Sequence, residues 1–208
     1  MHSQVLIVAS PGRGPRIECT GGLTARRTAP DTVHLVSAAA TPLGGDVISV
    51  RVIVDAGARL KVRSVAATLV LPGATTSQSQ SGWDLEVAGA LDLDPEPTVI
   101  AGGSGHQVVT RLRITDQGRV RLRERVQIGR TGEQAGFWTA TLHADRDAVP
   151  LLRHRVELGA GAVSDDEIVA PRAYVSELRY PETAFDGQGT VMALADGGCL
   201  ATWQGQRL

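Results

Sequence analysis

The chain has 208 residues, of which 42% are hydrophobic, 21% are charged and 3% are aromatic, and its formal net charge is -1. This length and apolar content allow one domain with a sizeable core and exclude a disordered chain. The near-neutral charge provides no overall field that attracts nucleic acid or an anionic membrane, so neither is expected as a partner. With so few aromatic residues, Val, Leu, Ile and Ala must build the core, which suits pleated sheets.

The first apolar run is short, because it extends from Val5 to Ala9 and is followed by Pro11 and Gly12. Such a run is too short for a signal-peptide core or a bilayer-spanning segment. The two cysteines, Cys19 and Cys199, form neither a metal-type pair nor a disulfide framework. We therefore expect a cytoplasmic protein.

Several segments alternate apolar and polar residues with a period of two, which indicates strands. Turn residues separate them, as at Asp55–Gly57 and at Gln117–Gly118. The predicted strands are Val47–Asp55, Arg59–Leu71, Val108–Asp116, Arg119–Ile128, Phe137–His143 and Leu151–Leu158.

An acidic or small residue with glycine recurs between strands, at Asp55–Gly57, Asp116–Gly118 and Gly159–Ala162. The spacing is uneven, so this is no strict repeat. The recurrence predicts an all-β fold of stacked β-hairpins in a β-helix-like layered arrangement. We expect this fold to form a single domain over residues 1–208.

Two stretches are predicted to be surface connections. Pro72–Gly82 is rich in Ser, Thr and Gln, and Asp92–Gly105 contains clusters of Asp, Pro and Gly. One or two short helices are expected, because Ser164–Val169 has a capping-box spacing from Ser164 to Glu167.

Strand phase places four polar side chains in rows that are otherwise apolar. They are Asp46, Thr68, Glu124 and His154. Because a buried charge is costly unless it is paired or solvated, four such residues indicate a polar internal route or a buried polar cluster. Each also has a simpler interpretation: Asp46 caps a turn, Glu124 pairs with an arginine of a neighbouring strand, His154 is a hydrogen-bonded core histidine, and Thr68 is an ordinary strand residue.

The opposite row of the Arg119–Ile128 segment consists of Arg119, Arg121, Arg123 and Arg125. A solvated face or a protected sheet edge is the favoured interpretation of this arginine row. No phosphate-binding loop, nucleophile elbow or paired histidine motif occurs, and residue pattern alone indicates no reaction and no catalytic residue.

A series of short motifs occurs in collinear order between Gly21 and Leu158. It begins with Pro42-Leu43-Gly44-Gly45-Asp46 before a strand. The later members are Ala56-Gly57-Ala58, Ala66-Ala67-Thr68, Pro95-Glu96-Pro97, Ile128-Gly129-Arg130, Gly132-Glu133 and Pro150-Leu151-Leu152. In order and spacing the series resembles the urease accessory protein D family (UreD, also called UreH). The part after Gly161 and the segment Leu69–Gly73 depart from the family pattern.

The resemblance implies a β-helical, all-β fold with a few short helices and no catalytic activity. It implies a complex with the accessory protein UreF, which recruits the GTPase UreG and docks on apo-urease. It further implies that nickel in transit passes through an internal tunnel to the urease active site, with no tightly bound cofactor. The positions that match the family's tunnel residues are Asp46, Thr68, Glu124 and His154, the last of which replaces a Glu.

Three functions follow for testing. The leading one is a nickel-transfer scaffold, for which Asp46→Ala or Glu124→Ala leaves folding intact and lowers the nickel content of co-expressed urease. The second is a structural adaptor that bridges its partners without contacting metal, through surfaces such as the Arg119–Arg125 face. The third is a small β-structured enzyme, which a clustered set of catalytic or metal-binding residues would support.

Overall fold

The computed structural model describes residues 1–115, 117–133, 135–165 and 170–208. In these ranges the chain forms strands and turns and contains no helix, which confirms the all-β class. The helix expected over Ser164–Val169 falls largely on residues 166–169, which lie outside the described residues, and Ser164 itself is in a turn. The described residues include no helix long and apolar enough to cross a membrane.

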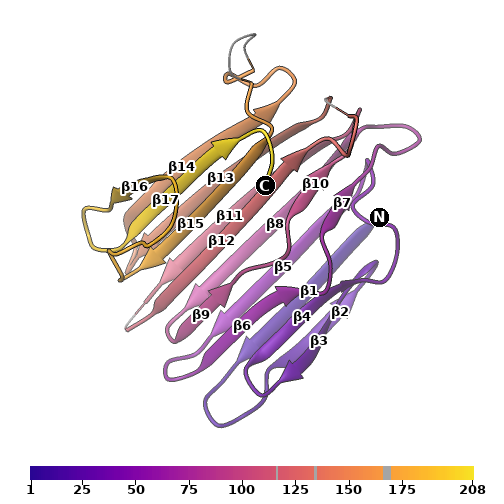
Figure 1. Cartoon of the computed structure of the whole chain (residues 1–208). Coiled ribbons are helices and arrows are strands. Elements are labelled where there is room, and N and C mark those ends of the chain that lie inside the picture. Colours follow the sequence, from indigo (N-terminus) through magenta and orange to yellow (C-terminus); the bar gives the residue numbers. More distant parts are fainter. Residues whose placement is uncertain (116, 134, 166–169) are drawn as a thin grey trace.

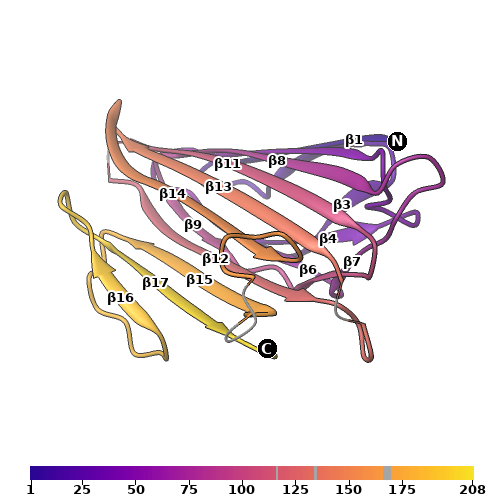
Figure 2. The same cartoon turned by 90° about the horizontal axis from the view of Figure 1, so that it is seen from above.

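Two sheets face each other along the whole length of the molecule, and Figure 2 shows them as two layers (Figure 1, Figure 2). In spatial order within the described residues, sheet 1 consists of β14 (Val149–Gly159), β13 (Phe137–Arg146), β11 (Gly105–Ile114), β8 (Gln78–Val87), β5 (Val47–Val54), β1 (His2–Ala9) and β2 (Arg16–Thr20). Sheet 2 consists of β16 (Thr190–Ala193), β17 (Cys199–Gly205), β15 (Ala173–Tyr180), β12 (Arg119–Ile128), β9 (Ala90–Leu93), β6 (Arg59–Ser64), β4 (Thr32–Ser37) and β3 (Leu23–Ala29), with β7 (Thr68–Val70) and β10 (Thr98–Ile100) beside this path.

The repeating unit is a coil, in which a strand of sheet 1 is followed by a turn and a strand of sheet 2. The pairs β5 and β6, β8 and β9, and β11 and β12 are built in this way. Equivalent strands of successive coils pair in parallel within each sheet. The two strands on either side of a turn do not pair with each other, because they lie in different sheets. The layered, β-helix-like arrangement is confirmed, and its units are coils where the sequence had predicted hairpins.

Glycines at the turns allow successive coils to stack closely. The backbone nitrogen of Gly89 donates to the carbonyl oxygen of Val54, with an N···O distance of 3.1 Å. A Cβ atom on Gly89 would lie 2.4 Å from the carbonyl oxygens of both Asp55 and Ala58 in the preceding turn. Gly118 is equally close to the backbone of the coil before it. The recurrence of glycine in the sequence therefore reflects turns that lie directly against one another.

The structure corrects three predicted boundaries. Arg59–Leu71 is not one strand, because residues 65–67 separate β6 from β7. The predicted connection Asp92–Gly105 contains the end of β9 and all of β10, and Pro72–Gly82 contains the start of β8. The alternation of Leu60, Val62, Thr68 and Val70 continues across the break, so periodicity cannot reveal it. Proline and glycine at the ends of β10 conceal this short strand.

Buried apolar side chains between the sheets form two separate clusters. The larger lies near the glycine turns and includes Val52 and Leu85, while the smaller includes Ile128 and Trp138 near the opposite strand ends. Trp83 is half-buried and packs against both clusters. The interior between the clusters is not filled by side chains.

Gly89→Ala is expected to lower the free energy of unfolding by about 1–3 kcal/mol, because the added Cβ must displace the backbone of the adjoining turn. Gly82→Ala is the matched control, since a Cβ there would meet only the carbonyl oxygen of Ile48 at 3.9 Å. Urea unfolding of the two variants measures the difference. Equal stability of the two variants would contradict the close stacking of turns.

Candidate functional site

A cavity of about 270 Å³ lies between the sheets. Most of its wall on sheet 1 is formed by two adjacent inward rows, in which each residue is the register partner of the next. These rows are Ile48, Ser81, Val108, Ala140 and Val156, and Val50, Trp83, Thr110, Leu142 and His154. Because the rows cross from β5 to β14, the cavity extends across the stack of coils. One water needs only roughly 10–15 Å³ of such volume, so the cavity has room for many.

Three of the four predicted site residues line this cavity. They are Thr68 from β7, Glu124 from β12 and His154 from β14. Strand phase therefore predicted their inward orientation correctly, and the structure brings them to one space. Among the described residues no three His, Cys, Asp or Glu side chains lie close enough together to hold a metal ion between them.

Glu124 and Glu96 are the two acidic residues that line the cavity. Glu124, on β12, is half-buried, and no ion pair or hydrogen bond to its carboxyl group is found among the described residues. The suggested pairing with an arginine of a neighbouring strand is therefore absent there. Burial raises the pKa of Glu124 to about 7, because a charged carboxylate is poorly stabilised away from bulk water. Near neutral pH this side chain can both hold and release a proton.

His154 contributes an imidazole to the same cavity. Its Nε2 atom lies 2.9 Å from the hydroxyl oxygen of Tyr174. Burial lowers the pKa of His154, so the neutral imidazole that can bind a metal ion is favoured. Burial also raises the pKa of Tyr174, and the negative charge of Glu124 adds to this effect. His154 is thus hydrogen-bonded and at the same time lines the cavity.

His106 is a cavity residue that sequence reasoning missed. It is 3% exposed, with Nδ1 2.8 Å from Ser79 Oγ and Nε2 3.0 Å from Ser81 Oγ. Burial lowers the pKa of His106 to about 4, so it is neutral at physiological pH. Its phase matches that of the buried Val108 and Leu112 in the same strand. This shared phase is the signal that could have identified it.

Asp46 lies in the turn beside the cavity. Its Oδ2 accepts hydrogen bonds from Thr41 Oγ1 at 2.8 Å and from Leu43 N at 2.9 Å, and its Oδ1 binds the ammonium group of Met1. Burial alone would raise the pKa of Asp46, but the hydrogen bonds from Leu43, Met1 and Thr41 outweigh it and hold the pKa below its usual value. Thr41 lines the cavity, whereas Asp46 does not. The turn-capping interpretation fits these contacts, and nickel contact by Asp46 stays a prediction.

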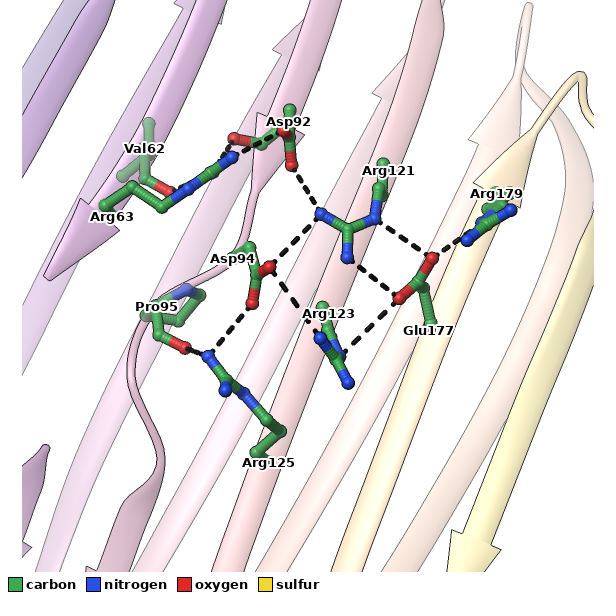
Figure 3. A network of polar contacts seen from close by, with 10 residues as sticks. All are labelled: Val62, Arg63, Asp92, Asp94, Pro95, Arg121, Arg123, Arg125, Glu177 and Arg179. Carbon is green, nitrogen blue, oxygen red and sulfur yellow. Dashed lines mark hydrogen bonds and ion pairs between the residues drawn. The ribbon is translucent and has the colours of Figure 1, made fainter. Parts of the chain in front are cut away.

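The arginine row of β12 is neither a sheet edge nor a freely solvated face, which corrects the favoured interpretation. β12 is an internal strand, because it pairs with β9 and β10 on one side and with β15 on the other. Arg121 bonds both carboxylate oxygens of Glu177 at 3.0 and 3.1 Å and also reaches Asp92 and Asp94 (Figure 3). Burial would raise the pKa of Glu177, but the guanidinium groups of Arg121 and Arg179 lower it overall.

Comparison with known protein families gives one consistent result. The model of the UreD urease accessory protein family matches residues 17–180. Urease accessory protein UreD 1 of Saccharopolyspora erythraea is 36% identical over 97% of this chain and 80% of its own length. UreD proteins of Frankia casuarinae and Frankia alni are 43% and 40% identical over 73% and 80% of this chain. The chain spans only 51% and 62% of the length of these two Frankia relatives.

Glu124→Gln is expected to remove a pH-dependent loss of stability. The pKa is about 7 in the folded state against the usual glutamate value of 4.5, so the folded protein holds this proton more tightly than the unfolded chain. The resulting stability is complete below the unfolded pKa and is lost as pH rises through about 7. At about pH 8 the variant should exceed the wild type by roughly 1–3 kcal/mol in free energy of unfolding.

Urea unfolding at about pH 4 and about pH 8 measures this difference. Glu18→Gln, which changes an exposed carboxylate, is the matched control and should follow the wild type. A difference between Glu124→Gln and wild type that is the same at both pH values would show that the carboxyl group does not titrate as described.

Proposed function

The chain belongs to the UreD family of urease accessory proteins, and from this premise we propose that it conducts nickel through its interior during urease maturation. Family membership supports the role in urease maturation. The cavity between the two apolar clusters supports the more specific role, because it crosses the coil stack and contains separate oxygen and nitrogen ligands. Nickel is the cargo of this process.

Ligand chemistry supports passage of the ion. Carboxylate oxygen and imidazole nitrogen both suit Ni²⁺, and Glu124 and His154 supply one of each. Thr68 adds a hydroxyl group where β7 borders the cavity. Each side chain contributes to coordination for part of the passage, and water in the cavity completes it. A few ligands at a time bind the ion weakly enough for it to leave.

The protonation of Glu124 makes this binding reversible. When the cavity holds no ion, the carboxyl group is largely protonated at slightly acidic pH, which avoids an unpaired charge in the interior. An arriving cation favours the carboxylate form and displaces the proton. When the ion moves on, the proton returns. The raised pKa of Glu124 thus couples nickel movement to proton exchange.

The partners belong to the same proposal. They are a UreF-like accessory protein, a UreG-like GTPase held through it, and apo-urease that receives the metal. The chain acts in the cytoplasm as a scaffold without catalytic activity of its own. A structural adaptor is the second candidate, and the ion-paired outer face of sheet 2 favours it because this face presents a large, ordered polar surface.

The double variant Glu124→Ala, His154→Ala should fold normally and should lower the nickel content of co-expressed urease several-fold, because the carboxylate and the imidazole proposed to coordinate the ion are lost. Metal analysis of the purified urease gives the nickel content, and thermal unfolding of the variant checks its fold. Glu18→Ala is the control, since this exposed carboxylate lies outside the cavity.

Full nickel loading by a folded double variant would exclude conduction through the cavity and leave the adaptor function. If nickel loading is instead lost in variants of the outer arginine row alone, the adaptor function explains the protein.

A further inference from the structure

Sheet 2 is interrupted at the same level in three successive coils. β4 ends at Ser37, β6 at Ser64 and β9 at Leu93, and the chain rejoins the sheet only at the bridge between Leu43 and Leu71 and at the pair of β7 with β10. The breaks lie side by side, because β4 pairs with β6 and β6 pairs with β9. β12 runs past them, and its residues 123–125 have no ladder partner on this side among the described residues. We call this interruption, bounded by residues 38–42, 65–67, 94–97 and 123–125, the slot.

The slot is where the interior cavity opens to solvent. Thr41 of the first break, Ala66 of the second and Glu96 of the third all line the cavity, as do residues 123–125 of β12. Ala66 and Glu96 are at the same time exposed at the molecular surface. Val65, which also lines the cavity, is 59% exposed. Solvent therefore reaches the cavity through sheet 2.

Hydrogen bonds across the slot fix its shape. Ser64 Oγ donates to the carbonyl oxygen of Ala66 at 2.9 Å and accepts from the backbone nitrogen of Glu96 at 2.9 Å, so it links the second break to the third. Arg125 of β12 donates to the carbonyl oxygen of Pro95 at 2.7 Å (Figure 3). The backbone that carries Glu96 is therefore held from both sides.

The charged groups around the slot balance one another. Arg123 and Arg125 flank Glu124 in β12 and belong to the ion-pair network on the outer face of sheet 2 (Figure 3). Asp94 lies 3.1 Å from Arg125, and Glu177 lies 3.6 Å from Arg123. When all groups are ionised the charges sum to zero, so the slot does not repel a cation overall. The five guanidinium groups belong to Arg63, Arg121, Arg123, Arg125 and Arg179, and the five carboxylates belong to Asp92, Asp94, Glu96, Glu124 and Glu177.

Two carboxyl groups of the slot have no partner of opposite charge within ion-pair distance. Among the described residues neither Glu96 nor Glu124 forms an ion pair or a side-chain hydrogen bond. Glu96 is exposed, whereas Glu124 is half-buried, so the two groups lie at different depths. Thr68 and Thr98 add hydroxyl groups to the same lining. Carboxylate and hydroxyl oxygens are ligands that divalent cations accept.

From these observations we propose that divalent cations enter the cavity sideways through the slot, with Glu96 as the outer ligand and Glu124 as the inner one. A hydrated ion exchanges a water for the carboxylate of Glu96 at the surface and then passes inward to Glu124. One carboxylate at a time binds the ion weakly, so the ion moves on. An anion finds no such ligand, because Arg123 and Arg125 already have carboxylates within 4.0 Å. The inference rests on the proposed function for the identity of the ion, which is nickel.

Stopped-flow mixing of the isolated protein with Ni²⁺ tests this entry, with the fluorescence of Trp83 as the reporter. Trp83 lines the cavity, and Ni²⁺ quenches tryptophan fluorescence at short range. The reference protein is Trp203→Phe, in which the other remaining tryptophan, Trp138, is 0% exposed. Glu96→Gln in this background should slow quenching by Ni²⁺ roughly threefold or more, because a carboxylate at the entrance is lost. The final extent of quenching should stay the same, and quenching by iodide should not become slower.

A positive group placed in the slot should slow entry further. Ala66→Arg adds bulk and charge at an exposed position of the lining and should slow quenching by Ni²⁺ roughly tenfold or more. Ser49→Arg is the matched control, because Ser49 is exposed in a groove on the outer face of sheet 1 that Trp83 also borders. This control should quench at the reference rate.

Thermal unfolding of each variant verifies the fold. Absence of quenching by Ni²⁺ in the reference protein, or reference rates in a folded Ala66→Arg, would overturn entry through the slot. Slower quenching in Ser49→Arg alone would show that ions approach Trp83 from the outer face of sheet 1 instead. Failure of entry is distinguishable from failure of conduction, because conduction is measured as the nickel content of urease co-expressed with Glu124→Ala, His154→Ala.

Discussion

Parallel hydrogen bonding between successive coils is the constraint on which the rest of the molecule depends. Each residue of β5 lies beside one residue of β8, which in turn lies beside one of β11, so side chains form straight rows across the stack. The row of Val52, Leu85 and Leu112 is large and apolar and closes the interior near the turns. The rows that contain Ser81 and Thr110 leave space, and because a row crosses every coil, that space extends through the stack.

In sheet 2 the breaks between β6 and β7 and between β9 and β10 remove part of this backbone pairing. Side chains on the outer face of the sheet replace the missing hydrogen bonds. Arg63 bonds the backbone oxygen of Asp92 at 2.8 Å, so it links β6 to β9. Arg121 joins Asp92 and Asp94 to Glu177, and so connects β9, β12 and β15. Arg125 holds the backbone where β9 ends. A half-buried set of shared ion pairs of this kind orders a region that backbone hydrogen bonds alone would leave loose.

Local sequence patterns predicted the strand content and the orientation of single side chains, but not which strands become neighbours. Alternation was sufficient to place Glu124 and His154 inward, because a strand's two faces are decided by residues next to each other in the chain. The surroundings of the arginine row depend on Asp92, Asp94 and Glu177, which are 27 to 56 residues away from Arg121. The break between β6 and β7 is also invisible to periodicity, since phase is preserved across it. Cavity walls arise from register between coils, and no single segment contains that information.

The stacking of turn upon turn, which Gly89 permits, has a consequence for how this architecture can vary. Each coil is bonded chiefly to the coil before it and the coil after it, as in other solenoids. Insertion of a further coil would lengthen the cavity without changing its cross-section, which only the side chains of each row determine. The length and the width of the cavity are therefore separate variables in this fold. Whole coils alter the length, and single substitutions alter the width.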